Sequence, residues 1–130
     1  MAIYKEVPKK NITRLEHFVA NEDLSGSQYC AVAFVSATSG MPKVGLPSAG
    51  GRVAGILQNY PIAGDIAEVM VEGESAWVAA GAFNGGIELA ADAAGKAVAA
   101  TSTNYVGGIS KQASAGANAQ VAVELKTYKI

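Results

Sequence analysis

The chain has 130 residues, of which half are hydrophobic but only 7% aromatic, and its formal net charge is −1. This length suits one domain that buries about two-thirds of its surface, and because much of the apolar content is alanine, self-association or a partner would add buried area. The balance of 10 basic and 11 acidic residues lacks the basic stripe of a nucleic-acid or anionic-membrane binder, so we expect no direct contact with either.

Residues 1–11 are predicted to form an extended arm, because Pro8 disfavours a helix and removes a backbone donor. Four apolar side chains of this arm are expected to contact the body or a neighbouring subunit: Ala2, Ile3, Tyr4 and Val7. Its cations are interpreted as a solvated tail, with a nucleic-acid arm as the alternative. No apolar span of about 18 residues and no signal peptide is visible, so we expect a soluble protein made in a cytoplasm.

Residues 12–24 fit two structures. Leu15, Phe18 and Val19 have the spacing of a short amphipathic helix, and a strand is the other interpretation. In either case the only histidine, His17, is expected at the surface beside charged neighbours. We therefore divide the chain into an arm with a connecting segment, residues 1–24, and a β-rich body, residues 25–130.

A turn at residues 25–28 leads into an apolar run, residues 29–36, that is long enough for a buried strand. This run contains Cys30, the only cysteine, which excludes an internal disulfide and a paired-cysteine metal clip. We expect Cys30 to be a small buried residue. The alternative, a catalytic nucleophile, would need a base, and His17 has no visible orienting partner.

Residues 37–51 are dense in glycine and proline and predict a loop with fixed turns. A phosphate cradle is the functional alternative, but neither phosphate-binding glycine motif occurs, and Lys43 precedes the glycines. The next predicted strand is residues 53–58.

Residues 66–72 alternate between apolar and acidic side chains, which is typical of a sheet with one wet face. Gly73-Glu74 is predicted to be a two-residue turn that forms a hairpin with residues 75–79. Trp77, the only tryptophan, is expected in the core or in a subunit interface rather than in a ligand platform.

The remainder of the chain consists of short apolar runs at residues 87–89, 96–100, 105–109 and 120–125, with a turn at 92–95. Short runs bounded by glycine, asparagine, aspartate and serine every ten residues or so are typical of all-β proteins. We predict a small single-domain β-barrel or β-sandwich with an extended N-terminal arm, closed by its last strand.

The order of these motifs over residues 25–126 resembles the small capsid cement or decoration proteins of tailed bacteriophages. The motifs are Val53-Ala54-Gly55-Ile56-Leu57, Gly64-Asp65-Ile66-Ala67-Glu68-Val69, Ala79-Ala80-Gly81, Asp92-Ala93-Ala94-Gly95-Lys96, Gly107, Ala113 to Gly116, and the final Val121, Val123 and Leu125.

The resemblance implies a structural virion protein on the outer surface of the capsid. Its partner would be the major capsid protein, it would bind as a homotrimer, and it would stabilise the expanded head against packaged DNA. It would have no enzymatic activity, no cofactor and no metal. The expected capsid or subunit contacts are Ala2, Ile3, Tyr4, Val7 and Trp77.

Three other classes of protein are alternatives. A biotinyl or lipoyl carrier domain would use Lys96 at a hairpin tip, but the residues around Lys96 differ from those of carriers. A hydrolase would need a base, and only His17 is available. A β-rich binding module on a virion or cell surface, for example one that binds carbohydrate, is the main alternative.

Overall fold

The computed structural model describes residues 13–36 and 40–129, and within these ranges it contains nine strands and no helix. The strands are β1 (Arg14–Ala20), β2 (Ala31–Val35), β3 (Lys43–Gly45), β4 (Gly55–Leu57), β5 (Ile66–Val78), β6 (Glu88–Ala91), β7 (Ala97–Ala99), β8 (Tyr105–Ser110) and β9 (Gln120–Lys129). The predicted all-β class is confirmed. None of the described residues forms a helix long and apolar enough to cross a membrane.

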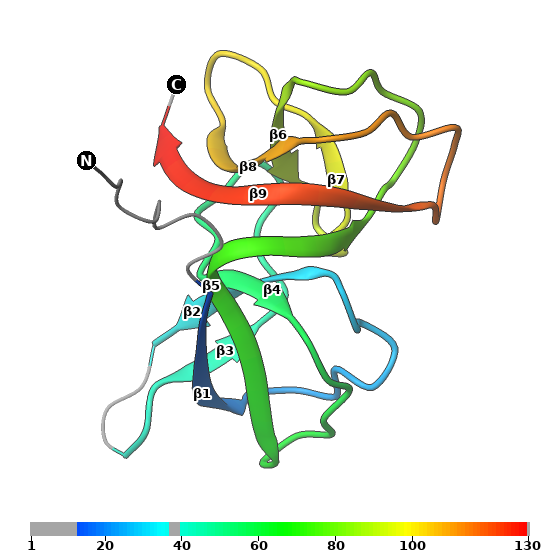
Figure 1. Ribbon diagram of the computed structural model, residues 1–130. Coiled ribbons are helices and arrows are strands. Elements are labelled where there is room, and N and C mark those ends of the chain that lie inside the picture. The colour runs from blue at the N-terminus through cyan, green and yellow to red at the C-terminus, as the bar shows by residue number, and fades with distance from the viewer. Residues whose placement is uncertain (1–12, 37–39, 130) are drawn as a thin grey trace, which may run out of the picture.

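The first half of the chain closes into a five-stranded barrel, which we call lobe 1 and which ends at residue 72 (Figure 1). β1 pairs with β3 in parallel, and β3, β2, β4 and the first half of β5 follow in antiparallel order. The antiparallel pairing of β1 with β5 completes the circle. Closure removes free strand edges from this lobe.

The second half of the chain, which we call lobe 2, begins at residue 73 and contains the rest of β5 together with β6 to β9. β5 pairs with β9, β9 with β8, β8 with β6 and β6 with β7, all antiparallel. A parallel bridge between Ala79 and Ala97 then returns β7 to the segment that follows β5. Lobe 2 therefore closes in the same way as lobe 1.

The two lobes repeat one five-stranded plan, strand for strand and in the same register. Phe18 pairs with Ala67 in lobe 1, and Trp77 pairs with Val121 at the matching place in lobe 2. The backbone repeats as well: Gly64 donates to the carbonyl of Ala20, and Asn118 donates to that of Ala79. Both donors have a positive φ, 89° and 70°. This second matching pair shows that the loop geometry, as well as the strand order, is repeated.

β5 is one strand that belongs to both lobes, so the predicted hairpin at Gly73-Glu74 is wrong. Residues 66–72 pair with β1 and β4, and residues 73–78 pair with β9. Gly73 has a φ of 108°, a conformation that glycine adopts without strain, and the ribbon of β5 bends where it passes between the lobes (Figure 1). The glycine bends the strand without ending it, and the second half of β5 pairs with a distant strand instead of folding back.

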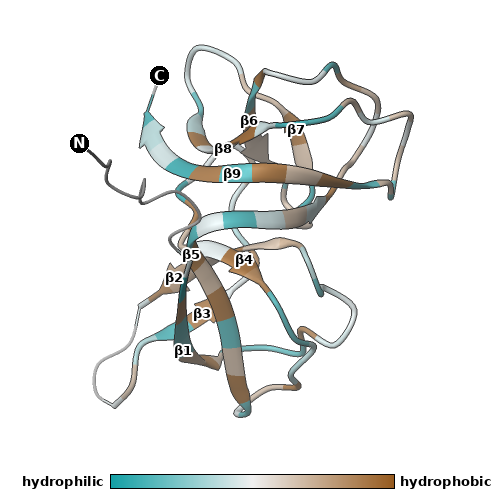
Figure 2. Cartoon of the chain, viewed as in Figure 1, coloured by the Kyte–Doolittle hydropathy of each residue, from teal (hydrophilic) through white to brown (hydrophobic). Residues whose placement is uncertain are grey.

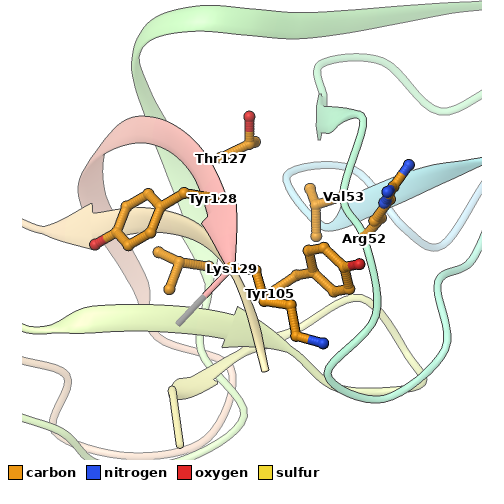
Figure 3. Close-up of a pocket in the computed structure, with 7 residues that line it drawn as sticks. Arg52, Val53, Tyr105, Thr127, Tyr128 and Lys129 are labelled. Carbon is orange, nitrogen blue, oxygen red and sulfur yellow. The ribbon is translucent and has the colours of Figure 1, made fainter. Parts of the chain in front are cut away.

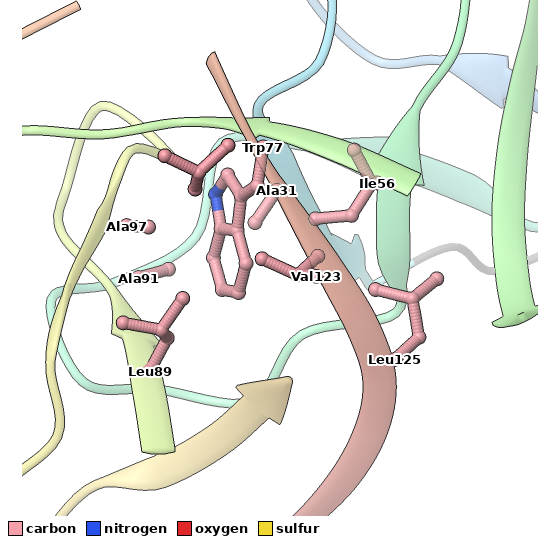
Figure 4. Close-up of a cluster of buried hydrophobic side chains, with 9 residues drawn as sticks. Ala31, Ile56, Trp77, Leu89, Ala91, Ala97, Val123 and Leu125 are labelled. Atoms are coloured by element: carbon pink, nitrogen blue, oxygen red, sulfur yellow. The ribbon is translucent and has the colours of Figure 1, made fainter. Parts of the chain in front are cut away.

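Each lobe has its own hydrophobic core. Lobe 1 is filled by Phe18, Ala20, Leu24, Val32, Val44, Leu57, Ala67 and Val69. Lobe 2 is filled around Trp77 by Ala31, Ile56, Leu89, Ala91, Ala97, Val121, Val123 and Leu125 (Figure 4). Successive residues of a strand face opposite sides, so β2 and β4 send Val32 and Leu57 into one core and Ala31 and Ile56 into the other.

Because two strands of lobe 1 supply side chains to the core of lobe 2, the lobes form one domain. Figure 2 shows apolar residues on β4 and along much of β9, while the part of β5 that crosses between the lobes is pale or polar. The strand interpretation of residues 12–24 is the correct one, since β1 pairs with β5 and buries Phe18 and Ala20. The predicted loop 37–51 contains a short strand, β3, which pairs with β2 and β1.

Candidate functional site

Of the five predicted contact residues, Trp77 is the one that the structure describes, while Ala2, Ile3, Tyr4 and Val7 lie outside the described residues. Trp77 is fully buried, and its indole Nε1 donates to the carbonyl oxygen of Gly95 at 2.9 Å. Trp77 is therefore a core residue, which is one of the two positions expected from the sequence. In this conformation its ring is not accessible to another molecule.

The residues considered for catalysis lie in different environments. His17 is exposed on β1, with its Nε2 3.8 Å from Oε2 of Glu68 on β5. Cys30 is buried, and burial raises the pKa of its thiol, with smaller electrostatic effects from Lys96 and Asp92. No group of three histidine, cysteine or acidic side chains within the described ranges could hold a metal ion.

Lys96 follows the predicted turn at Asp92 to Gly95, which the structure confirms. The backbone amide of Gly95 donates to the carbonyl of Asp92, and the Asp92 carboxylate accepts from the amides of Ala94 and Lys96. The Lys96 ammonium donates to Oδ1 of Asn118 at 2.7 Å. The lysine is therefore tied to the neighbouring loop rather than extended from a free hairpin tip.

The loop between β4 and β5, together with the first residue of β5, exposes three large apolar side chains, which we call the apolar tip: Tyr60, Ile62 and Ile66. Their exposed fractions are 64%, 56% and 44%. Tyr60 and Ile66 also line a shallow depression of about 340 Å³ that includes Asn59, Pro61 and Asp65. Exposed apolar groups gathered on one loop are a common mark of an interaction site.

Hydrogen bonds hold this loop in place against lobe 1. Leu24 donates its amide to the carbonyl of Pro61, and Ala20 donates to that of Asp65. The Asn59 side chain donates to the Ile66 carbonyl at 3.0 Å and accepts from the amide of Glu68 at 3.0 Å. The apolar tip is therefore presented on an ordered loop, which lowers the entropy that binding would cost.

Lobe 2 has an equivalent loop, between β8 and β9, that is one residue longer and lacks the large apolar side chains. The amide of Phe83 donates to the carbonyl of Ser114, as the amide of Leu24 does to that of Pro61 in lobe 1. In the same way, the amide of Ala79 donates to the carbonyl of Ala119, as that of Ala20 does to Asp65. By this correspondence Ala113 stands where Tyr60 does, and Gln120 stands where Ile66 does. Since the loop forms with small or polar residues in lobe 2, folding alone does not require the apolar tip.

Sequence analysis missed the apolar tip, although the signal was present as large apolar residues within a segment bounded by turn residues, Asn59 to Asp65. Other large apolar side chains are exposed elsewhere in the chain: Leu15, Phe34, Met41 and Tyr128. Phe34 packs its ring edge-on against Phe18, with centroids 5.0 Å apart. A second hollow, lined partly by Arg52 and Tyr105, lies between the lobes.

Comparison with known proteins gives a likeness of fold. No protein-family model matches the chain, and no curated protein matches it. The crystal structure of the head fiber gp8.5 N base of bacteriophage phi29 superposes with a TM-score of 0.72 at 13% sequence identity. The match covers 92% of this chain and 98% of that chain. The two proteins share one fold.

The coverage of the match says more about the shared fold than the sequence identity does. A coverage of 92% of this chain means that both lobes have counterparts in the phi29 protein, and not the closed barrel of lobe 1 alone. At 13% identity the likeness concerns the arrangement of strands, while the residues that function in either protein must be argued separately.

Proposed function

We propose that this protein is a structural component of a tailed-phage virion that binds the outer surface of the major capsid protein lattice and stabilises the expanded head. The observation that carries the proposal is the fold shared with a phage head fiber base over nearly its whole length. The sequence resemblance to capsid cement proteins points to the same class independently of that comparison.

The apolar tip is the surface that we propose meets the capsid. Tyr60, Ile62 and Ile66 expose large apolar area on an ordered loop, and burying such area against a partner is favourable by about 25 cal/mol for each Å². Tyrosine is also among the residues that contribute most at protein interfaces. The comparison with lobe 2 supports a binding role for the apolar tip, since the positions that match Tyr60 and Ile66 are occupied there by Ala113 and Gln120.

We further propose that the protein acts as a homotrimer. Its buried residues include many alanines, for example Ala31, Ala67 and Ala97, so each subunit buries little apolar area for its length. Association of subunits would add buried area, and three-fold symmetry would match the three-fold and quasi-three-fold positions of a capsid lattice. Light scattering of the purified protein measures the subunit number, and a monomer at all concentrations would contradict the trimer.

The test of the capsid contact uses expanded heads from a phage that lacks this protein, mixed with the purified chain and pelleted. The test variant combines Tyr60→Ala, Ile62→Ala and Ile66→Gln, which gives lobe 1 side chains of the kind found in lobe 2. We expect the unaltered protein to sediment with heads in near-stoichiometric amount and the variant to bind about tenfold or more weakly. Its fold should be unchanged.

The matched control is Leu15→Ser with Met41→Ser, which removes two side chains that are each 46% exposed but lie outside the apolar tip. This control should bind heads as the unaltered chain does. If the unaltered protein stays in the supernatant, the capsid proposal is wrong. If it binds and the test variant binds equally, the protein is a capsid protein that uses another surface.

The alternative function is a β-rich binding module on a virion or cell surface. The observation in its favour is the cavity between the lobes, whose lining includes Tyr105, Tyr128 and two cations and would suit a carbohydrate that bears an acidic group. A glycan screen of the purified protein tests it, and a strong hit together with failure to sediment with heads would replace the capsid proposal.

A further inference from the structure

A cavity of about 310 Å³ lies where the two lobes meet (Figure 3). Its walls come from the segment before β4 in lobe 1 and from β8 and the end of β9 in lobe 2. Seven residues line it: Arg52, Val53, Tyr105, Val106, Thr127, Tyr128 and Lys129. A hydrogen bond from the amide of Tyr105 to the carbonyl of Gly50, 3.0 Å long, holds the two sides together.

Two cations lie close to the ring of Tyr105, one of the residues that line this cavity. Cζ of Arg52 is 5.3 Å from the centroid of the Tyr105 ring, and Nζ of Lys129 is 5.1 Å from it. A hydrogen bond from Arg52 and the charges of both cations lower the pKa of the Tyr105 phenol. The local field of the cavity is therefore positive.

No carboxylate neutralises these charges within the part of the chain that the structure describes. Arg14, Lys111 and Lys126 each lie within ion-pair distance of a glutamate, whereas no such pair involves Arg52 or Lys129. No acidic residue lines the cavity. The nearby Glu88 carboxylate already accepts a hydrogen bond from the Tyr128 hydroxyl.

The chemistry of the lining favours an organic anion over other ligands. A nucleic acid would need a row of cations along its backbone, and only two are present here. A neutral sugar would stack on a free aromatic face, but the Tyr105 ring is already in contact with two cations. Val53 and Val106 supply apolar wall beside the cations, which suits the short aliphatic stem of an acidic side chain.

We propose that this cavity binds the carboxylate of an aspartate or glutamate side chain on an acidic segment of a partner protein. Arg52 and Lys129 hold the carboxylate oxygens by charge-assisted hydrogen bonds, and the Thr127 hydroxyl is available as a further donor. The site uses residues distinct from the apolar tip, so it does not depend on the capsid proposal.

The test is a titration of the isotope-labelled protein, followed by the backbone amide signals of Val53, Val106 and Thr127. The probe is N-acetyl-glutamate amide, and the uncharged N-acetyl-glutamine amide is the matched ligand control. We expect saturable shifts with the glutamate compound, with a dissociation constant in the millimolar range, and none with the glutamine compound. The bound carboxylate should also raise the pKa of Tyr105, which a titration of its ring carbon signal measures.

The variants Arg52→Gln and Lys129→Gln should each weaken binding about fivefold or more, because each removes one charged donor. The control variant Lys111→Gln removes a lysine that pairs with Glu74 outside the cavity and should bind as the unaltered chain does. Equal shifts with both ligands, no shifts at all, or equal binding by all three variants would overturn the proposal. Tighter binding of glucuronate than of the glutamate compound would show that the site takes an acidic sugar instead.

Discussion

Gly55 and Gly108 occupy matching positions in the two lobes, and each lets a short strand approach its neighbour closely. A Cβ atom on Gly55 would collide with the carbonyl oxygen of Met70, and one on Gly108 would lie 2.9 Å from that of Glu124. Met70 and Glu124 are themselves matching residues, paired with Ile56 and Ile109. The same steric requirement therefore recurs in both lobes and explains why glycine stands at both places.

Gly55→Ala should destabilise the protein by about 2–3 kcal/mol, because the backbone of β5 must move to admit the methyl group. Gly26→Ala is the control, since a Cβ there would meet no atom within 4 Å, and it should change the stability by less than about 0.5 kcal/mol. Urea denaturation of the three proteins measures both values. Equal midpoints for the two variants would show that the β4 to β5 approach is looser than described.

The bend in β5 is the feature that joins the lobes, since one continuous strand contributes to both. The bend occurs at Gly73, whose φ is 108°, and the six residues from Gly73 to Val78 pair with β9. A side chain at this position would be strained whatever space surrounds it. The residue is therefore required by the backbone path and not by packing.

Gly73→Ala should cost about 1–3 kcal/mol of folding stability through this backbone strain. Gly81→Ala serves as its control, since a Cβ at Gly81 has open space and the backbone there is not in the positive φ region. Thermal and urea unfolding of both variants give the comparison. A Gly73→Ala protein as stable as the control would mean that β5 can straighten without loss.

The molecule as a whole is expected to unfold as one unit although it contains two barrels. Ala31 and Ile56 belong to strands of lobe 1 and pack in the core of lobe 2, so loss of one lobe exposes the core of the other. Single domains of this size usually unfold in one cooperative transition. Trp77, the only tryptophan, lies in the core of lobe 2 and reports on that lobe by fluorescence.

Val69→Ala in lobe 1 and Val123→Ala in lobe 2 test this cooperativity at matching, fully buried positions. Each should cost about 2 kcal/mol, from lost burial and the cavity left behind. For both variants the midpoints from Trp77 fluorescence and from far-ultraviolet circular dichroism should coincide. If Val69→Ala shifts the dichroism but leaves the fluorescence midpoint in place, the lobes unfold separately.

The local features of the chain could be predicted from sequence because they depend on residues close together. Alternation over residues 66–72 predicted a half-buried strand, and Ala67 and Val69 are indeed buried. The turn at Asp92 to Gly95 was predicted from its residue types and is present. Residues 12–24 stayed ambiguous because Leu15, Phe18 and Val19 fit two periods, and pairing with β5 decides between them.

The candidate sites could not be predicted in this way. The apolar tip is recognised as a candidate binding surface because the matching loop of lobe 2 forms without large apolar side chains. The two loops are matched by their backbone hydrogen bonds, which the sequence does not reveal. Arg52 and Lys129 are far apart in sequence, and only the meeting of the lobes brings both to Tyr105.

The sequence by itself determined the all-β class, most strand positions and most of the places where the chain turns, because these follow from short-range side-chain patterns and backbone preferences. Only the tertiary structure decided that β5 runs on through Gly73 instead of turning back, that both halves close into the same barrel, and that a positive cavity forms between them. Each of these depends on which distant strands pair, and that choice is made by the burial of whole faces rather than by any local motif.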